Sequence, residues 1–238
     1  MTVISNCFLE ELAGYHALAR RAALGYLRAD GVSHYLRAPA AEYLERGGKG
    51  LRPALCLATC GAFGGEVNDA LPSAAAIELM HTAFLVHDDV EDDSDVRRGE
   101  PTLHRQYGRA LAINAGDGLA VLALGALRDN EGRLGRRLSS RIWSEFDFMA
   151  RQTVDGQALE LGWQREGRID LTADDYLDLI MKKTCWYTTV LPLRVGALIG
   201  TKGAGALGMK IDPFGAGGIA LDAGLKIAPK IYAHVTGD

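Results

Sequence analysis

The chain has 238 residues, 48% hydrophobic and 24% charged, which is ordinary for a soluble globular protein and excludes disorder as its main state. A formal net charge of −4 argues against a protein that binds nucleic acid by neutralising phosphates. Four cysteines do not form a disulfide framework in a chain of this length, so we expect a reducing, cytoplasmic setting. Glycine is in excess, with 29 residues, and is densest after residue 200.

No segment predicts a membrane protein. Residues 1–11 contain two acidic side chains and no basic segment, so they do not resemble a signal peptide. No stretch reaches 18 apolar residues without a charge. We therefore expect no membrane-spanning helix.

Seven segments show the periodicity of apolar side chains that is typical of α-helices. They cover residues 10–28, 38–46, 52–62, 70–92, 102–127, 133–165 and 173–200. Runs of β-branched residues are few, and no Asn-Gly turn separates alternating strands, so no hairpin is expected. These features predict an all-α fold, a bundle of antiparallel helices around a central cavity. We expect one domain over residues 1–238, in which residues 203–238 are atypical.

Single residues suggest where these helices begin and break. Pro53 falls in the first turn of the third segment, where proline is tolerated. Ser73 is a candidate cap for the fourth segment, and Gly116 and Gly118 are expected to interrupt the fifth. Thr172, followed by two aspartates, is a plausible start for the last.

Residues 87–99 form a dense acidic run that ends in two arginines. Six of the eight residues 88–95 are acidic, which is costly in self-repulsion. A solvated charged face is one interpretation. However, the run directly continues the apolar segment 77–86, which looks buried, and its charge reverses abruptly at Arg97 and Arg98. Both features favour a binding site.

The spacing of the aspartates suits a hard cation. Asp88 and Asp92 are four apart, so on a helix both carboxylates project from one face, with Asp89 beside them. Such oxygens suit Mg²⁺, which usually shares its shell with water and a substrate phosphate. The neighbouring arginines are well shaped for phosphate. Because residues 47–50 are too short for a mononucleotide phosphate loop, the pattern indicates a diphosphate substrate held through Mg²⁺.

Several short motifs together resemble one family. They are GGKGLRP at 47–53, ELMH at 78–81, DDVED at 88–92 with RRG at 97–99, GQALE at 156–160 and KT at 183–184. In this order they resemble the isoprenyl (polyprenyl) diphosphate synthases of the short-chain trans-prenyltransferase type, over roughly residues 15–200. The resemblance implies a single-domain helical bundle of the isoprenoid synthase type, a homodimer, and dependence on Mg²⁺. It also implies condensation of isopentenyl diphosphate with an allylic prenyl diphosphate.

The same resemblance implies roles for individual residues. The first aspartate-rich motif would be Asp88, Asp89 and Asp92, with Asp88 and Asp92 as the direct metal ligands. The allylic diphosphate would be held by Arg97 and Lys183. The residues that line the cationic reaction centre would be Thr184 and Gln157, although Gln157 could also only bridge helices. Four residues would bind isopentenyl diphosphate: Lys49, Arg52, His81 and Arg98. The alternative for His81 is a core histidine.

Phe84 lies one helical turn before Asp88. In the family that the chain resembles, bulk at this position floors the pocket in which the product grows. Ala83, the preceding residue, is small, so the resemblance implies a short product of C15 or C20. The alternative is that Phe84 is an ordinary core residue.

The chain departs from the family pattern near its end. By the resemblance, the second aspartate-rich motif corresponds to residues 225–232, where Lys226, Pro229 and Lys230 stand in place of the glutamine and aspartates of the family. Cations exclude a metal at that position, and proline breaks a helix interior at a cost of about 3 kcal/mol. Since the chain ends where family members usually continue, we also expect the C-terminal helices of the bundle to be missing. Activity would then be weak.

Three functions fit these features. The first is a prenyltransferase that makes a short-chain prenyl diphosphate, impaired by the loss of the second motif. The second is a non-catalytic subunit that forms a heterodimer with a complete synthase, because Cys56 and Cys60 have the CxxxC spacing of an interaction motif in some plant relatives. A buried apolar pair is the plainer interpretation of these cysteines. The third is a terpene-cyclase-like enzyme.

Overall fold

The computed structural model describes residues 3–28 and 31–202, and residues 225–232 lie outside this range. Its elements, in chain order, are α1 (Val3–Leu27), α2 (His34–Glu45), α3 (Leu51–Ala62), α4 (Val67–Glu91), β1 (Val96–Arg97), β2 (Glu100–Pro101), α5 (Leu103–Tyr107), α6 (Arg109–Glu166), α7 (Ala173–Ile180), the π-helix η1 (Met181–Val190) and α8 (Leu191–Gly200). The all-α prediction is confirmed for the described residues, apart from one two-stranded ladder.

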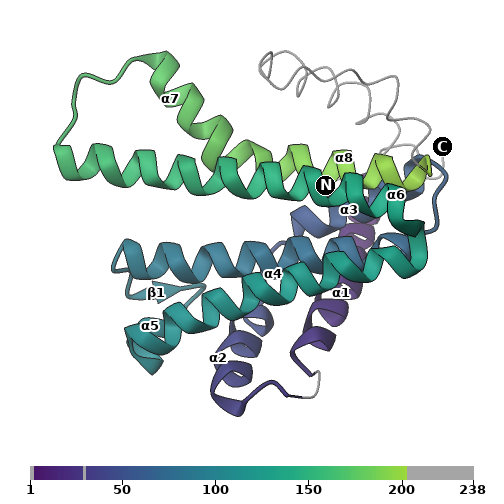
Figure 1. Cartoon of the computed structure of the whole chain (residues 1–238), viewed down its shortest axis with the longest axis horizontal. Helices are drawn as coiled ribbons and strands as arrows, with labels where there is room; N and C mark the ends of the chain where they lie inside the picture. Colours follow the sequence, from purple (N-terminus) through teal and green to yellow (C-terminus); the bar gives the residue numbers. More distant parts are fainter. Residues whose placement is uncertain (1–2, 29–30, 203–238) are drawn as a thin grey trace.

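Helix α4 is the centre of the bundle. It packs against α1, α3 and, most extensively, α6, and many of its side chains are buried. Figure 1 shows that α6 folds back on itself, so that its first half accompanies α4 and its second half accompanies α7, η1 and α8. The reversal falls at Gly135, whose φ of 75° and ψ of 161° are not helical. Helix α4 and η1 can therefore supply side chains to a space between them.

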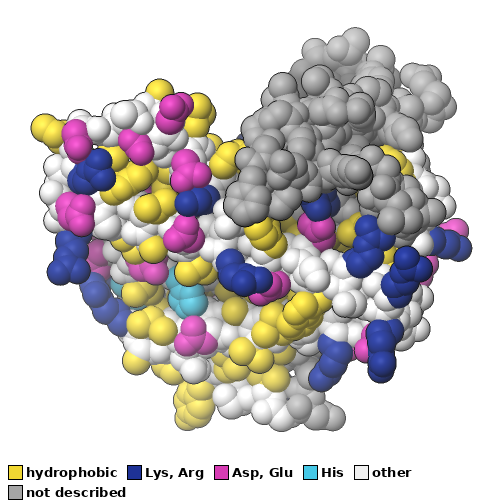
Figure 2. All heavy atoms as spheres, turned by 45° about the horizontal axis from the view of Figure 1, so that its top comes forward, with side chains coloured by type: hydrophobic (Ala, Val, Ile, Leu, Met, Phe, Trp, Pro, Cys, Tyr) yellow, Lys and Arg dark blue, Asp and Glu magenta, His cyan; other side chains and the backbone are white. Residues whose placement is uncertain are grey.

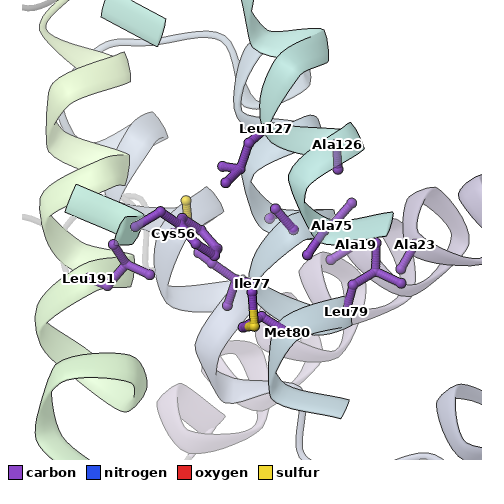
Figure 3. Close-up of a cluster of buried hydrophobic side chains, with 14 of the residues drawn as sticks. Ala19, Ala23, Cys56, Ala75, Ile77, Leu79, Met80, Ala126, Leu127 and Leu191 are labelled. Carbon is purple, nitrogen blue, oxygen red and sulfur yellow. The ribbon is translucent and has the colours of Figure 1, made fainter. Parts of the chain in front are cut away.

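Small side chains let these helices approach closely. Ala19, Ala23, Ala75 and Ala126 are fully buried, and they lie together with larger residues such as Leu127 in the core shown in Figure 3. Alanine loses no side-chain entropy on burial and is the best helix former. A core built in this way depends on close helix contact more than on large side chains.

Helices α3 and α8 cross at two cysteine–glycine contacts. Cys56 and Cys60 are fully buried. A Cβ added to Gly196 would lie 2.4 Å from the Cys56 carbonyl oxygen, and one added to Gly200 would lie 2.6 Å from that of Cys60. The interpretation of the cysteines as a buried pair is confirmed. Because they face α8 of the same chain, they are not exposed for contact with a partner subunit.

Two predictions about the helices were wrong. Helix α4 begins at Val67, and the Ser73 hydroxyl lies inside it, donating a hydrogen bond to Asn130 Oδ1 (3.1 Å). Gly116 and Gly118 do not break a helix: they lie within α6, where a Cβ would collide with the rings and branches of neighbouring side chains. These glycines are explained by close packing. By contrast, the predicted start at Thr172 is confirmed as a full capping box.

The expectation that the chain contains no hairpin was also wrong. Strands β1 and β2 pair antiparallel around Arg98 and Gly99, whose φ values are 56° and 84°. Positive φ at both central positions is the signature of a type I′ turn. Each strand has two residues, so the sequence offers no alternation to detect. The hairpin carries both arginines of the acidic motif.

Helix α6 contains an 18-residue stretch apolar enough to cross a membrane, of which 39% is buried. Core helices of soluble proteins meet the same criterion, so this stretch is weak evidence for a membrane-spanning helix. The absence of a membrane-spanning helix stays a prediction.

Candidate active site: an acidic pocket beside a cationic pocket

An acidic pocket of about 260 Å³ lies between α4, the second half of α6 and η1. Its lining joins charged, polar and aromatic side chains, several of them from the predicted motifs: Phe84, His87, Asp88, Glu91, Gln157, Lys183 and Tyr187. Asp88 and Phe84 come from α4, Gln157 from α6 and Lys183 from η1, so three motifs distant in sequence meet here. Asp92, Arg97 and Thr184 are not among its lining residues, although the charge of Arg97 acts on the Asp88 carboxyl.

The Asp88 carboxyl sits in an unfavourable environment. Burial, with smaller contributions from the Glu91 and Asp92 charges, raises its pKa to about 6, although Lys183 and Arg97 oppose the shift. Asp88, Glu91 and Asp92 also crowd the C-terminal end of α4, where the helix dipole is negative and acids are disfavoured. Repulsion among these carboxylates is therefore unfavourable, and a bound cation would reduce it.

The Asp88 and Asp92 carboxylates suit an Mg²⁺ ion that is shared with water and a phosphate ligand. Asp88 and Asp92 supply hard carboxylate oxygens one turn apart, as Asp92 N–H donates to the Asp88 carbonyl (2.8 Å). No cluster of three His, Cys, Asp or Glu side chains in the described part of the chain could hold a metal by itself. Mg²⁺ usually takes one or two carboxylates and completes its shell with water and substrate phosphate. Two carboxylates beside an anion site are thus a sufficient protein contribution.

Asp89 faces away from this pocket. It is 1% exposed; its Oδ1 accepts hydrogen bonds from Arg97 Nε (2.8 Å) and Nη2, and its Oδ2 accepts one from the Tyr43 hydroxyl. Arg97, expected to contact a diphosphate, is thus anchored by the second aspartate of the motif. Its Nη1 has no hydrogen bond to the described residues in this arrangement.

Lys183 is held at the pocket by Glu160 and by a close helix contact. Its ammonium pairs with the Glu160 carboxylate. Burial lowers its pKa, but the hydrogen bond and charge of Glu160 outweigh burial and raise it overall. A Cβ on Gly156 would lie 2.5 Å from the Lys183 backbone nitrogen, so only glycine lets α6 and η1 meet there. π-helical turns of this kind occur frequently at functional sites.

Gln157 bridges helices as well as lining the acidic pocket. Its Nε2 donates to Glu91 Oε2 on α4 (2.7 Å). Its Oε1 is buried and has no hydrogen-bond partner among the described residues. An unpaired buried acceptor of this kind is costly and suggests a group that is completed by a ligand.

A cationic pocket of about 510 Å³ lies next to the acidic one, between the loop before α3, α4 and the hairpin. The four residues expected to bind isopentenyl diphosphate all line it: Lys49, Arg52, His81 and Arg98. Gly48 has a φ of 155°, and a Cβ there would lie 2.7 Å from Arg98 Nη2. Gly48 therefore lets the backbone pass directly beside the Arg98 side chain of the hairpin.

Arg52 is fixed in this pocket by three partners. Its Nη2 donates to Thr188 Oγ1 (2.9 Å), its Nη1 lies 3.3 Å from His81 Nε2, and its guanidinium stacks 4.3 Å from the centre of the Tyr187 ring. Burial, followed by the charges of Arg52, Arg98 and Arg97, lowers the pKa of His81 well below its usual value. His81 is therefore a neutral polar group at neutral pH.

Two residues of this site were missed by the sequence. Glu78 is 6% exposed and lines the cationic pocket, and burial raises the pKa of its carboxyl. Its place three residues before His81 on α4 was a usable signal. Tyr187 lines the acidic pocket, contacts Phe84 edge-on with centroids 5.8 Å apart, and also carries Arg52. Nothing in the sequence signals Tyr187, because its position depends on the π-helix.

The charge separation is specific to these pockets. Figure 2 shows one face of the molecule, where acidic and basic side chains both lie among hydrophobic ones. The pairs Arg151–Asp147 and Lys182–Asp155 are surface examples from α6 and η1. Exposed pairs of this kind contribute little to stability. In the two adjoining pockets one sign of charge predominates, with Lys183 as the exception in the acidic pocket and Glu78 in the cationic one.

Comparison with known proteins points in one direction. A family model described as polyprenyl synthetase matches residues 33–215. A short chain isoprenyl diphosphate synthase of Methanothermobacter thermautotrophicus is 38% identical over 163 residues, which is 68% of this chain and 48% of that protein. A geranylgeranyl diphosphate synthase of Sulfolobus acidocaldarius is 41% identical over 156 residues, 64% of this chain and 46% of that protein. The chain thus spans about half the length of these curated relatives.

Solved structures share the fold. The geranylgeranyl pyrophosphate synthetase of Pyrococcus horikoshii superposes with a TM-score of 0.76 at 30% identity, covering 82% of this chain and 57% of that one. A synthase from Zymomonas mobilis, at 22% identity, has a TM-score of 0.75 over 99% of this chain and 94% of its own, and shows the fold alone. The family model covers most of the chain, and it includes every motif that builds the two pockets. This chain belongs to the polyprenyl synthetase family.

Proposed function

We propose that this chain is a short-chain prenyl diphosphate synthase that joins isopentenyl diphosphate to an allylic diphosphate. The observation that carries the proposal is the pair of adjoining pockets of opposite charge. A diphosphate that binds through Mg²⁺ suits the acidic pocket, with Asp88 of its lining and Asp92, one helical turn further along, as ligands. A diphosphate that binds directly to arginine and lysine suits the cationic pocket. The reaction needs one substrate of each kind, held side by side.

The chain's own residues have clear parts in this reaction. When bound, Mg²⁺ supplies positive charge that stabilises the departing diphosphate. Lys183 and Arg97 orient that diphosphate while the allylic C–O bond breaks and its electron pair leaves with the oxygen. The isopentenyl double bond then attacks the allylic cation, and a proton is lost to the released diphosphate. The Tyr187 face and the unpaired Gln157 oxygen border the space where the cation forms, and both favour positive charge.

A short product, C15 to C20, also belongs to this proposal. Phe84 lines the acidic pocket one turn below Asp88, and the edge-on contact with Tyr187 holds its ring there. The pocket volume of about 260 Å³ leaves little room for a long chain. The relatives cited above are likewise named for short-chain and geranylgeranyl products.

We propose a homodimer as the assembly. Helix α6 exposes a series of apolar side chains that the described part of the chain does not cover: Leu111, Ile113, Val121 and Leu124. Exposed apolar surface of this kind is typical of a subunit interface. A heterodimer with a complete synthase through Cys56 and Cys60 is not favoured, because α8 covers both.

A labelled condensation assay tests the function. Purified protein is incubated with radiolabelled isopentenyl diphosphate and dimethylallyl, geranyl or farnesyl diphosphate, in Mg²⁺ and in EDTA. We expect Mg²⁺-dependent formation of C15 to C20 prenyl diphosphates. Absence of labelled product at high protein concentration would contradict the proposal. Hydrocarbon formed from farnesyl diphosphate alone would point to a cyclase instead.

A further inference from the structure

Tyr43 is a buried residue of α2 outside every motif that suggested the function. Its side chain is 3% exposed, and its hydroxyl donates a hydrogen bond to Oδ2 of Asp89. Burial, together with the hydrogen bond to Asp89, raises the pKa of Tyr43, so the phenol stays protonated and remains a donor. The bond joins residues 46 positions apart and connects α2 to the end of α4.

Both carboxylate oxygens of Asp89 accept hydrogen bonds from other side chains. Oδ1 takes two hydrogen bonds from Arg97, and Oδ2 takes the one from Tyr43. The carboxylate does not line the acidic pocket, although Asp88 beside it does. Asp89 therefore links the Tyr43 hydroxyl to the Arg97 guanidinium through hydrogen bonds. A buried carboxylate that lost one of these partners would retain an unpaired charge, which is costly and favours movement of the whole group.

Tyr43 is itself fixed by the same hairpin that carries Arg97. The Arg46 guanidinium lies 4.6 Å from the centre of the Tyr43 ring. Arg46 Nη1 also donates to the Pro101 carbonyl on β2 (2.6 Å). Helix α2 thus holds the hairpin at two points, one through Arg46 and the backbone, the other through Tyr43, Asp89 and the Arg97 side chain.

We propose that Tyr43 is a positioning residue for the diphosphate bound at the acidic pocket: its hydroxyl fixes Asp89, and Asp89 fixes the guanidinium of Arg97. The inference rests on the proposed function only for the identity of the ligand. Neither Tyr43 nor Arg97 lines the cationic pocket, whereas the charge of Arg97 acts on Asp88 of the acidic pocket, so the Tyr43 hydroxyl should matter for one substrate and not for the other.

The test uses Tyr43→Phe, which keeps the ring beneath Arg46 and removes the hydroxyl. Calorimetry measures the dissociation constant of geranyl diphosphate in Mg²⁺ and that of isopentenyl diphosphate in EDTA. We expect the first to rise about tenfold, because a buried charge loses a hydrogen bond. The second should stay within about twofold. Steady-state kinetics should show the same split between the two KM values.

Tyr107→Phe is the matched control. The Tyr107 hydroxyl also donates to a carboxylate, Glu42 Oε2 (2.6 Å), close to the same hairpin, but it does not touch Asp89. Its removal should leave both constants unchanged. A merely structural role for Tyr43 would make the two variants behave alike, or would raise both constants of Tyr43→Phe equally, and either result overturns the inference.

Asp89→Asn keeps the test decisive if Tyr43→Phe folds poorly by circular dichroism. It retains the shape of the side chain and removes the charge that holds Arg97, so the same split is expected. Wild-type protein that binds geranyl diphosphate but forms no product would contradict the proposed function and leave this inference standing. Wild-type protein that does not bind geranyl diphosphate would overturn both.

Discussion

The two pockets carry opposite predominant charges, and in each of them burial shifts the pKa of one side chain. The acidic pocket gathers carboxylates at the negative end of α4, where burial raises the pKa of Asp88 to about 6. The cationic pocket gathers Lys49, Arg52 and Arg98 around His81, whose pKa is lowered by burial and then by the charges of Arg52, Arg98 and Arg97. In each pocket the predominant charges repel one another while no ligand is bound. A ligand of the opposite sign would reduce this repulsion.

The difference between the pockets lies in how rigidly they are built. Arg52 has three partners before any substrate binds. In the acidic pocket, Lys183 is paired with Glu160, while among the described residues the Asp88 carboxylate has no side-chain hydrogen bond and Gln157 Oε1 is unpaired. A preformed site loses less entropy on binding. We infer that the cationic pocket recognises its substrate as it stands, whereas the acidic pocket is completed by its ligands.

Asp88→Asn should produce the largest effect. It removes a proposed metal ligand, so product formation should fall at least about 100-fold, in line with the loss of one group that stabilises a developing charge. Binding of isopentenyl diphosphate should not change. Asp95→Asn is the control from the same acidic run, since Asp95 is exposed and pairs with Arg105 (2.8 Å). Equal losses in the two variants would show that the acidic run acts only through its total charge.

Gly156→Ala should loosen the acidic pocket alone. Its Cβ would lie 2.5 Å from the Lys183 backbone nitrogen, so we expect the free energy of unfolding to fall by about 1–3 kcal/mol. Gly162→Ala, on the same helix with nothing within 4 Å of its Cβ, should instead gain up to about 1 kcal/mol. Urea denaturation measures both. If both alanines stabilise the protein, the close approach of α6 and η1 is not tight.

Arg52→Lys should weaken the cationic pocket alone. Lysine cannot reproduce the forked contact with Thr188 and His81 or the stacking on Tyr187, so the KM for isopentenyl diphosphate should rise about tenfold. The KM for the allylic substrate should not change. Arg133→Lys, at an exposed arginine that donates to the Asn68 carbonyl (3.3 Å), should alter neither value. A parallel rise in both KM values would mean that the pockets are not separate.

His81→Gln should give the smallest effect on stability, and that effect should depend on pH. The His81 pKa lies below its unfolded value of 6.5, so below that pH the unfolded chain binds more protons and stability is lost. The variant should lose less stability as pH falls below about 6.5, by at most ~1.4 kcal/mol per pH unit. Urea unfolding between pH 5 and 8 measures the slope. Identical slopes in wild type and variant would contradict a depressed pKa.

The sequence predicted the helices well where one face of a segment repeats over many turns. It misjudged the glycines of α6, because Gly116 and Gly135 look alike in sequence and differ only in what packs against them. It could not reveal the hairpin, since two-residue strands carry no pattern. Boundaries also shifted where a cap depends on tertiary contact, as at Ser73.

Most of the residues that the motifs singled out lie together in two pockets, but the motifs did not predict how the residues pair. The residues expected for isopentenyl diphosphate share one pocket, and Asp88, Phe84, Gln157 and Lys183 share the other. The sequence grouped Asp89 with Asp88, whereas the structure turns it toward Tyr43. Such a pairing arises from the meeting of α2 and α4, which no local pattern encodes.

Tyr187 contributes to both pockets. The Arg52 guanidinium of the cationic pocket stacks on its ring, and Phe84 of the acidic pocket lies in edge-on contact with it. A change at this one position would therefore reach both pockets at once, whereas the changes at Asp88 and Arg52 are each expected to act on one.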